Sequence, residues 1–358
     1  MANKAIYPFS ADPIHNGHIN NIERVLETGL FDEVLVGIGK NYEKETKYLF
    51  SDEERLEITK KSLQHLGKRV KVELFEGLLA HYADKNGCSI IIRGLRNNTD
   101  FEQEQTMAEF NKAYGLTTFT IPAPKNIFNI SSTTIKSIVS NGGLVHEYVP
   151  INVKQALEEK LLGVTLVGVT GNTGSGKTTL CKKMGVNFID VDKLIHEIYQ
   201  KSNKVKNDLK NEFGGKVFSG GKVDRKKLGN LIFTDTLARE KLANILQVPF
   251  KIKLEESFQG LEGIVLLDCA YLVEYDLLSI VNNNVILMTC SDGEKIKRNK
   301  KAENILGVQY DDKKLEDEIR IRIKQDYAGN LLKINSEKNI NYSEILKRLK
   351  KWNILRQK

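Results

Sequence analysis

The sequence has no long hydrophobic run. None of its 358 residues lies in an uninterrupted apolar stretch of roughly 18 residues, so no membrane-spanning helix is expected. The first ten residues, MANKAIYPFS, enter a strand-like stretch at once and lack the zones of a secretory signal peptide. Only four cysteines occur, Cys88, Cys181, Cys269 and Cys290, and they form no CxxC pair. Each lies in or beside apolar sequence, which indicates reduced core cysteines of a cytoplasmic protein.

Internal repeats, low-complexity segments and a Pro-, Ser- or Gly-rich linker are also absent. Short apolar strand patterns alternate instead with longer helical patterns. The strand patterns cover residues 34–39, 70–76, 89–94 and 117–122, and a helical pattern covers 51–66. This alternation predicts an α/β fold, in which a parallel sheet is covered by helices on both faces.

The length of the chain exceeds what one hydrophobic core usually serves, so two domains are expected. A helical segment, 151–163, ends in Gly163, and the apolar run TLVGVTG then restarts the pattern at Thr165. We therefore predict domains 1–162 and 163–358, each a doubly wound parallel sheet, closely coupled because no linker separates them. The net charge of +8 suits anionic partners. The motifs below favour phosphorylated small molecules over nucleic acid.

Two histidines follow the first predicted strand, in the stretch YPFSADPIHNGH. Ligands of open parallel sheets bind beyond the carboxyl ends of the strands, and a helix starting there offers free N–H groups to phosphate. His15 and His18 are therefore candidate hydrogen-bond donors to phosphate, and Gly17 would let the backbone approach the ligand. The alternative is a pair of loop histidines without a role. Zinc is disfavoured because no other His or Cys pair has ligand spacing.

HNGH resembles the T/HxGH signature of the nucleotidylyltransferase superfamily, and ISSTTIK (130–136) resembles its second, triphosphate-binding signature. Helix capping is the alternative explanation for Ser131, Ser132 and Thr133. Segments 49–58, 77–83 and 91–111 resemble phosphopantetheine adenylyltransferase, with a mononucleotide adenylyltransferase as the alternative. RGLR followed by DFEQE places Arg93 and Arg96 on one loop, where two guanidinium groups can clamp phosphate. The resemblance covers nearly all of 1–162.

This resemblance implies a Rossmann-like domain that transfers an adenylyl group from ATP to 4′-phosphopantetheine and releases pyrophosphate. It implies that Ser10 contacts both substrates and that His18 and Lys44 stabilise the transferred phosphoryl group, with Lys47 as the alternative to Lys44. The other implied contacts are Leu79 with pantetheine, Arg93 with the substrate phosphate, and His15, Gly94, Arg96, Glu104, Ser131, Ser132 and Thr133 with ATP. Phe9 and Ala11 depart from the family's usual glycine and phenylalanine.

The stretch GVTGNTGSGKTTL (168–180) follows a strand pattern and contains GxxxxGK[ST] from Gly171 to Thr178. On a strand–loop–helix pattern this spacing predicts a P-loop, whose backbone N–H groups wrap phosphate. Lys177 would reach the β- and γ-phosphates, and Thr178 would bind Mg²⁺. The predicted ATP-binding residues are Gly171, Asn172, Thr173, Gly174, Ser175, Gly176, Lys177, Thr178 and Thr179.

Asp190 and Asp192 come just after the next short strand pattern. Two carboxylates at i and i+2 on a strand end point the same way, so one could accept a hydroxyl proton while the other orients Mg²⁺. The alternative is a pair of caps for the next helix. Segments 188–199, 222–233, 264–274 and 320–326 resemble dephospho-coenzyme A kinase, a P-loop kinase with a helical lid.

By this second resemblance, Asp192 is the base for the ribose 3′-hydroxyl, and Asp190 beside it contacts substrate and metal. Arg225 would contact the acceptor, and Arg298 and Arg322 would act from the lid side. The family's HP segment reads LQVP (246–249) here, without its histidine, and Ala270 replaces the proline of a second family segment.

Together the two halves resemble a bifunctional coenzyme A synthase of bacterial type, with Mg²⁺ as cofactor and ATP, 4′-phosphopantetheine and dephospho-coenzyme A as substrates. A non-catalytic nucleotide-binding protein is the remaining alternative. The basic C-terminus (346–358) is interpreted as an amphipathic helix rather than as an RNA or membrane contact. The resembled adenylyltransferases form hexamers, which is the sole basis for expecting a homo-oligomer.

Overall fold

The computed structural model describes residues 3–40, 47–96, 98–124, 130–298 and 312–355. The first half is a five-stranded sheet in the order β3-β2-β1-β4-β5, with every neighbouring pair parallel. Its strands are β1 (Lys4–Phe9), β2 (Glu33–Gly39), β3 (Val70–Phe75), β4 (Ile90–Leu95) and β5 (Thr117–Pro122). Its helices are α1 (Asn16–Glu27), α2 (Asp52–Leu63), α3 (Leu79–Lys85), α4 (Asn98–Lys112) and α5 (Ser132–Ser140).

The central strands of this sheet are hydrophobic along their whole length because helices cover both faces. β1 and β2 are buried in their interiors, whereas the edge strand β3 alternates between partly buried and exposed residues. The strand patterns of the sequence are confirmed. The helix predicted over 51–66 ends at Leu63, and a 3₁₀ segment, Gln64–Arg69, follows it. Gly67 in that segment has φ of +61° and is not helical. Glycine adopts such a positive φ more readily than other residues do.

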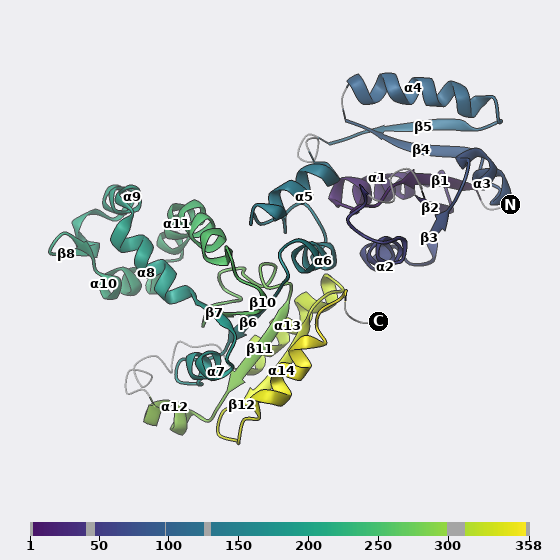
Figure 1. Ribbon diagram of the computed structural model, residues 1–358. Helices are drawn as coiled ribbons and strands as arrows, with labels where there is room; N and C mark the ends of the chain where they lie inside the picture. The colour runs from purple at the N-terminus through teal and green to yellow at the C-terminus, as the bar shows by residue number, and fades with distance from the viewer. Residues whose placement is uncertain (1–2, 41–46, 97, 125–129, 299–311, 356–358) are drawn as a thin grey trace.

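The second half repeats the α/β plan with the strand order β12-β11-β6-β10-β7, again parallel throughout. The strands are β6 (Val164–Thr170), β7 (Asn187–Asp190), β10 (Gly263–Asp268), β11 (Asn284–Thr289) and β12 (Asn330–Asn335). The flanking helices are α7 (Lys177–Lys183), α8 (Val191–Lys201), α12 (Asp292–Arg298), α13 (Asp312–Gln325) and α14 (Tyr342–Lys350). The expectation of two doubly wound parallel sheets is confirmed (Figure 1).

A helical extension lies between β7 and β10, with a hydrophobic cluster of its own. It contains α9 (Asn203–Phe213), α10 (Arg225–Thr234) and the long α11 (Thr236–Phe258). A short antiparallel ribbon of β8 (Phe218–Ser219) and β9 (Lys222–Val223) joins α9 to α10. In Figure 1 these helices form the end of the molecule farthest from the first sheet. The second half therefore contains a helical part in addition to its sheet and flanking helices.

Helix α6 (Ile151–Leu161) connects the two sheets and is buried on nearly every side. Lys154 is fully buried, donates to the carbonyl of Ile280 at 2.8 Å and pairs with Glu158 at 2.6 Å. Asn282 donates to the same glutamate at 2.7 Å. These bonds join α6 to the loop before β11, so the two halves are coupled without a linker. The predicted boundary after residue 162 lies between α6 and β6 and stays a prediction.

The sequence predicts an amphipathic helix over 346–358, and the structure confirms it only up to Lys350, where α14 ends. Residues 351–355 follow as turn and bend. Ile345 and Leu349 of α14 are buried against the second sheet. Beyond it, Glu159 of α6 accepts backbone hydrogen bonds from Ile354 and Leu355 at 3.1 Å. All four cysteines are buried and have free thiols. No helix in the described ranges has the length and apolar character needed to cross a membrane.

Candidate active sites

The first candidate site lies at the carboxyl edge of the first sheet, where the strand order reverses between β1 and β4. Such a switch point opens a crevice that binds ligands in open α/β sheets. His15 and His18 stand at the start of α1, which follows β1, while Arg93 and Gly94 lie near the end of β4. The structure therefore brings together two motifs that are about 75 residues apart in the sequence. The expectation that Arg93 and Arg96 share one loop is wrong for Arg93, because the strand continues to Leu95 and only Arg96 lies beyond it.

The two histidines interlock at the N-terminus of α1. The Nδ1 atom of His15 accepts the backbone N–H of Gly17 at 3.1 Å, and Nδ1 of His18 accepts the N–H of His15 at 3.3 Å. Their rings stack with centroids 3.6 Å apart. Because each Nδ1 is an acceptor, the neutral rings carry their proton on Nε2. Both histidines can therefore donate a hydrogen bond from Nε2.

Gly17 has a reason to be glycine that the sequence did not reveal. A Cβ at this position would lie 2.9 Å from Cε1 of His15, closer than real Cβ contacts come. The glycine therefore makes room for the His15 ring that caps the helix. Phe9, the departure from the resembled family, packs its ring against His18 with centroids 4.7 Å apart.

Burial keeps both histidines neutral. It lowers the pKa of His15 to about 4, with Arg96 adding to the shift. Burial also lowers the pKa of His18 well below its usual 6.5, and the neighbouring His15, Arg96 and Arg93 act in the same direction. At neutral pH the pair therefore offers hydrogen-bond donors without adding positive charge of its own.

These lowered pKa values predict how stability depends on pH. In the unfolded chain each histidine takes up a proton near pH 6.5, whereas His15 in the native state does so only near pH 4. The unfolded state therefore binds more protons in this window, and stability falls as the pH falls from about 6.5 to about 4. We expect melting temperatures between these pH values to show the decline. The variant His15→Asn keeps a capping acceptor but does not titrate, so its decline should be shallower; an equal slope would contradict the assignment.

A cavity of about 240 Å³ opens at the same sheet edge, and Phe9, which packs against His18, is part of its wall. Ser10, Leu79, Arg93 and Glu104, four residues predicted to bind ligand, all line it. Apolar side chains form most of the remaining wall, namely those of Pro8, Phe9, Tyr48, Phe75, Ile91 and Met107. The cavity combines an apolar wall with a cationic group, which suits a phosphate attached to an apolar arm.

Arg93 is held in the cavity by a bidentate pair with Glu104, whose Oε2 lies 2.7 Å from Nε. Its Nη1 also donates to the carbonyl of Pro8 at 3.0 Å. Glu104 therefore fixes the plane of the guanidinium group in the structure, in addition to the ATP contact predicted for it. Arg96 pairs with Asp100 at 2.9 Å and lies beside the start of α5, 3.5 Å from the carbonyl oxygen of Ile130.

The start of α5 also faces the histidine loop. Ser131 caps the helix by accepting the N–H of Thr134 at 3.1 Å, as the capping alternative proposed. Ser132 instead donates to the carbonyl of Pro13 at 2.8 Å, and Thr133 is exposed. Lys44 lies outside the described residues, and its alternative Lys47 is exposed.

The second candidate site is the loop between β6 and α7, which has the form of a P-loop. Gly171, Gly174 and Gly176 have φ of +135°, +84° and +93°, values that side chains rarely permit. A Cβ at Gly171 would lie 2.1 Å from the carbonyl oxygen of Met288. These glycines therefore allow the tight wrap that aims successive N–H groups inward.

Lys177, the first residue of α7, lies across this loop. Its Nζ donates to the carbonyls of Gly171 at 2.8 Å and Asn172 at 3.1 Å. Burial lowers the pKa of Lys177, and the negative charges of Asp268 and Asp192 oppose that shift. The ammonium group is thus held in the loop by two backbone carbonyls.

Asp268 is a residue that the sequence analysis missed. It ends β10, is 5% exposed, and accepts the hydroxyl of Thr178 at 2.6 Å. Burial raises the pKa of its carboxyl group. The sequence does hold a signal, since the apolar run GIVLLD ends in this acid. Asp268 contacts the P-loop residue Thr178 because β10 lies next to β6. No sequence motif predicts which strands are neighbours.

The expectation that Asp190 and Asp192 share a strand end is wrong. β7 ends at Asp190 and α8 begins at Val191, so Asp192 lies in the first turn of a helix. Asp190 caps that helix by accepting the N–H of Lys193 at 3.0 Å, because an orphan N–H at a helix start needs an acceptor. The capping alternative is thus right for Asp190, which also pairs in register with Asp268 of the neighbouring strand.

The predicted lid arginines differ in their positions. Arg298 of α12 donates to the hydroxyl of Ser336 at 2.7 Å, and its Nη1 would lie 3.6 Å from a Cβ at Gly176. Arg298 therefore borders the P-loop. Of the other predicted ATP-binding residues, Asn172, Thr173 and Ser175 lie in the loop between β6 and α7, whereas Thr178 and Thr179 lie in α7. Ser175 is fully buried.

Arg322 is directed elsewhere. The first residue of α13, Asp312, accepts a bond from Asn172 of the P-loop at 2.6 Å, whereas Arg322 lies ten residues further along, about 15 Å at helical rise. It donates to Asp276 at 2.8 Å. Arg225 begins α10, and its side chain lies outside the described residues.

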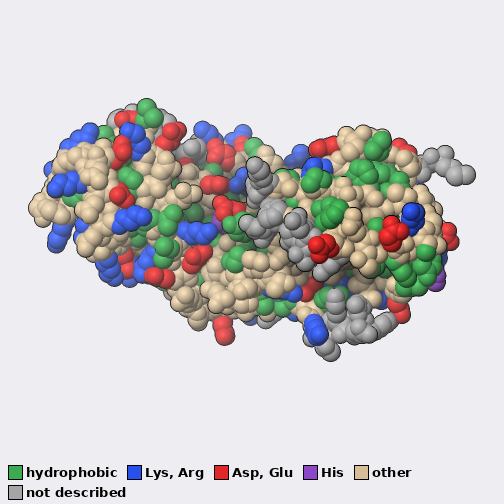
Figure 2. Space-filling model, turned by 90° about the horizontal axis from the view of Figure 1, so that it is seen from above, with side chains coloured by type: hydrophobic (Ala, Val, Ile, Leu, Met, Phe, Trp, Pro, Cys, Tyr) green, Lys and Arg blue, Asp and Glu red, His purple; other side chains and the backbone are tan. Residues whose placement is uncertain are grey.

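The basic excess of the chain lies entirely in the second half. Residues 1–162 hold 19 Lys and Arg against 21 Asp and Glu, a net −2, which leaves +10 for residues 163–358. Figure 2 shows Lys and Arg side chains more often over the second half than over the first. Anion binding in the first half must therefore come from local groups such as Arg93 and Arg96 rather than from a general positive field.

Comparisons with known proteins agree with this division. Residues 165–337 match the dephospho-CoA kinase family, and residues 6–138 match the cytidylyltransferase-like family. A phosphopantetheine adenylyltransferase of Pseudarthrobacter chlorophenolicus is 45% identical over 155 residues, 43% of this chain and 91% of that protein. One from Renibacterium salmoninarum is 43% identical over 44% of this chain and 96% of that protein. One from Syntrophomonas wolfei is 44% identical over 161 residues, which are 44% of this chain and 96% of that protein.

Proposed function

The chain belongs to the phosphopantetheine adenylyltransferase family in its first half and to the dephospho-CoA kinase family in its second, and we propose the following division of labour between its two sites. It is a bifunctional enzyme that carries out the last two steps of coenzyme A biosynthesis. The first site joins the adenylyl group of ATP to 4′-phosphopantetheine and releases pyrophosphate. The second phosphorylates the 3′-hydroxyl of dephospho-coenzyme A with ATP.

Adenylyl transfer needs positioning and charge stabilisation more than covalent help, because the substrate phosphate is already a nucleophile. The cavity would hold the pantetheine arm against Leu79, with its phosphate on Arg93. The Nε2–H groups of His15 and His18 would donate to ATP phosphates at the N-terminus of α1. Ser10, which lines the cavity, would contact both substrates.

The kinase step needs an in-line approach of the 3′-hydroxyl to the γ-phosphate. The P-loop N–H groups and Lys177 would hold the phosphates and offset the charge that develops on them. Asp192, whose negative charge acts to raise the pKa of Lys177, is the candidate base for the hydroxyl. Arg298, beside Gly176, would act on the same phosphates from the lid side.

Magnesium fits the second site as a partner of ATP. No three His, Cys, Asp or Glu side chains within the described ranges are arranged to hold a metal by themselves. The Thr178 hydroxyl and Asp268 carboxylate, 2.6 Å apart, do provide the few hard oxygen ligands that Mg²⁺ takes together with nucleotide phosphates. When bound there, Mg²⁺ would neutralise charge on the phosphates. Asp190, on the neighbouring strand, remains a predicted further contact.

One observation carries the assignment of the first site: Ser10, Leu79, Arg93 and Glu104 converge on one cavity, whose wall includes Phe9, the residue packed against His18. The test is pyrophosphate release by the purified chain with ATP and either 4′-phosphopantetheine or nicotinate mononucleotide. We expect release with the first acceptor alone. Release with the mononucleotide alone would favour the alternative adenylyltransferase, and release with neither would favour a non-catalytic protein.

The carboxylates of the kinase site predict different responses to magnesium. Replacing Asp192 by Asn removes the candidate base, so kinase turnover should fall by roughly 10²-fold at any Mg²⁺ concentration. Replacing Asp268 by Asn weakens a metal contact instead, so raised Mg²⁺ should restore part of the rate. Kinase assays of both variants across a Mg²⁺ titration check this. Rescue of Asp192→Asn with Asp268→Asn remaining inactive would reverse the two roles.

The four buried, unpaired thiols support a reducing, cytoplasmic location. Assembly into a homo-oligomer rests on the resemblance to hexameric adenylyltransferases and stays a prediction.

A further inference from the structure

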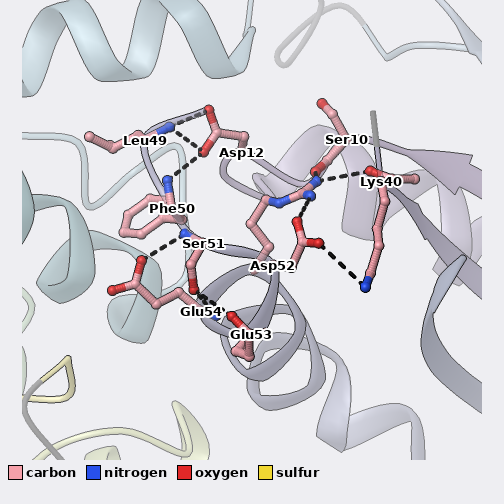
Figure 3. Close-up of polar contacts among 11 residues, drawn as sticks. Ser10, Asp12, Lys40, Leu49, Phe50, Ser51, Asp52, Glu53 and Glu54 are labelled. Carbon is pink, nitrogen blue, oxygen red and sulfur yellow. Dashed lines mark hydrogen bonds and ion pairs between the residues drawn. The ribbon is translucent and has the colours of Figure 1, made fainter. Parts of the chain in front are cut away.

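Asp12 is a buried carboxylate that has no role in the adenylyl transfer proposed above. It lies in the loop between β1 and α1, between Ser10 and His15, and is 3% exposed. Both of its oxygens accept the backbone N–H of Leu49 at 3.1 Å, and Oδ1 also accepts that of Phe50 at 3.1 Å (Figure 3). Its Oδ2 further pairs with Nζ of Lys136 at 2.6 Å.

These bonds join three segments that are distant in sequence. One is the histidine loop itself, and the second is the short segment that leads into α2. The third is α5, because Lys136 lies in that helix one turn after its start. The Ser132 hydroxyl, which donates to the carbonyl of Pro13, adds a second bond between α5 and the same loop.

Arg55 holds the histidine loop at Ser10, where the loop leaves β1. It is fully buried, and its Nη1 donates to the carbonyl oxygens of Ser10 and Gly39. Its Nη2 pairs with Asp52, which also lies 3.7 Å from Nζ of Lys40 (Figure 3). The buried Arg55 guanidinium group therefore holds the loop at Ser10. The buried carboxylate of Asp12 holds the same loop through its own bonds to the segment before α2 and to Lys136.

Buried ion pairs are a poor means of gaining stability, because the cost of desolvating both charges offsets much of their attraction. They do fix geometry, since each bond has a defined length and direction. The Asp12–Lys136 pair sets the separation between the loop that carries His15 and His18 and the helix whose start is predicted to bind triphosphate.

We propose that Asp12, acting with Lys136, is a positioning residue for adenylyl transfer. It touches neither substrate in this proposal. It keeps the histidine donors and the Ser131–Thr133 helix start at the spacing that one triphosphate requires. The proposal rests on the adenylyl-transfer function proposed above.

The test compares Asp12→Asn, Lys136→Met and the double variant by steady-state adenylyl transfer with varied ATP. A misplacement of about 1 Å can cost on the order of 10²-fold in rate. We expect kcat to fall by roughly 10-fold to 100-fold in each single variant. The double variant should lose no more than Asp12→Asn alone, because both changes disturb one geometry. Lys136→Arg, which keeps the charge, should recover most of the rate.

Two internal standards separate positioning from folding. Kinase activity on supplied dephospho-coenzyme A, measured on the same samples, should stay at the wild-type level. Lys4→Met, which removes a 3.6 Å pair with Glu33 at the opposite edge of the sheet, should leave both activities unchanged. If Asp12→Asn does not fold, Lys136→Met decides, since it leaves the backbone bonds of Asp12 in place.

The proposal is overturned if the variants keep the wild-type kcat, or if their loss disappears when rates are divided by the folded fraction measured from thermal melts. A wild-type chain that releases no pyrophosphate would instead contradict the proposed function itself. The two failures are therefore distinguishable in one set of assays.

Discussion

Replacing His18 by alanine should abolish adenylyl transfer, with a fall in kcat on the order of 10³-fold, while kinase activity persists. The ring offers a neutral Nε2–H donor at the N-terminus of α1, and burial keeps it neutral by lowering its pKa. The second phosphate site lies on a separate sheet, so the loss should not reach it. The measurement is pyrophosphate release with 4′-phosphopantetheine, alongside coenzyme A formation from supplied dephospho-coenzyme A.

His65→Ala is the matched control for this variant. His65 is a histidine of the same domain that pairs with Glu23 at 2.8 Å, in the 3₁₀ segment that precedes β3 and thus at the amino edge of the sheet. Its loss should leave both activities unchanged. If folded His18→Ala protein loses both activities together, the two sites are not independent.

Replacing Lys177 by alanine should stop the reaction at dephospho-coenzyme A, which accumulates. Lys177 lies across the P-loop, where its ammonium group can offset charge that develops on the transferred phosphoryl group. We expect kinase turnover to fall on the order of 10³-fold and adenylyl transfer to be unaffected. Chromatography of the products formed from ATP and 4′-phosphopantetheine measures both quantities at once.

Lys183→Ala provides the comparison, because this lysine ends the same helix and is exposed. It should form coenzyme A at the wild-type rate. Coenzyme A formation at a normal rate by Lys177→Ala would show that the P-loop assignment is wrong.

Local patterns predicted much of this fold. The strand patterns fall within one or two residues of β2, β3, β4 and β5, because fully covered parallel strands are continuous apolar runs. The P-loop was predictable because its glycines are required by backbone geometry within a few residues. The convergence of Ser10, Leu79, Arg93 and Glu104 followed from a family resemblance rather than from periodicity, which cannot state which strand ends meet.

Contacts that depend on tertiary neighbours were not predictable. Asp268 meets Thr178 only because β10 lies beside β6, and Asp12 meets Lys136 across 124 positions of sequence. Asp192 was assigned to the same strand end as Asp190 because the apolar run gives no sign that a helix begins directly after Asp190. The β8–β9 ribbon was missed because two-residue strands carry no periodicity.

The most direct test of the central claim, that one chain performs both transfers, is a double-label experiment. The purified chain is given 4′-phosphopantetheine, Mg²⁺ and ATP labelled with distinguishable isotopes at its α- and γ-phosphorus atoms. The account predicts coenzyme A that carries the α label in its diphosphate bridge and the γ label at its 3′-position. Product that carries the α label alone, or no labelled product, would contradict it.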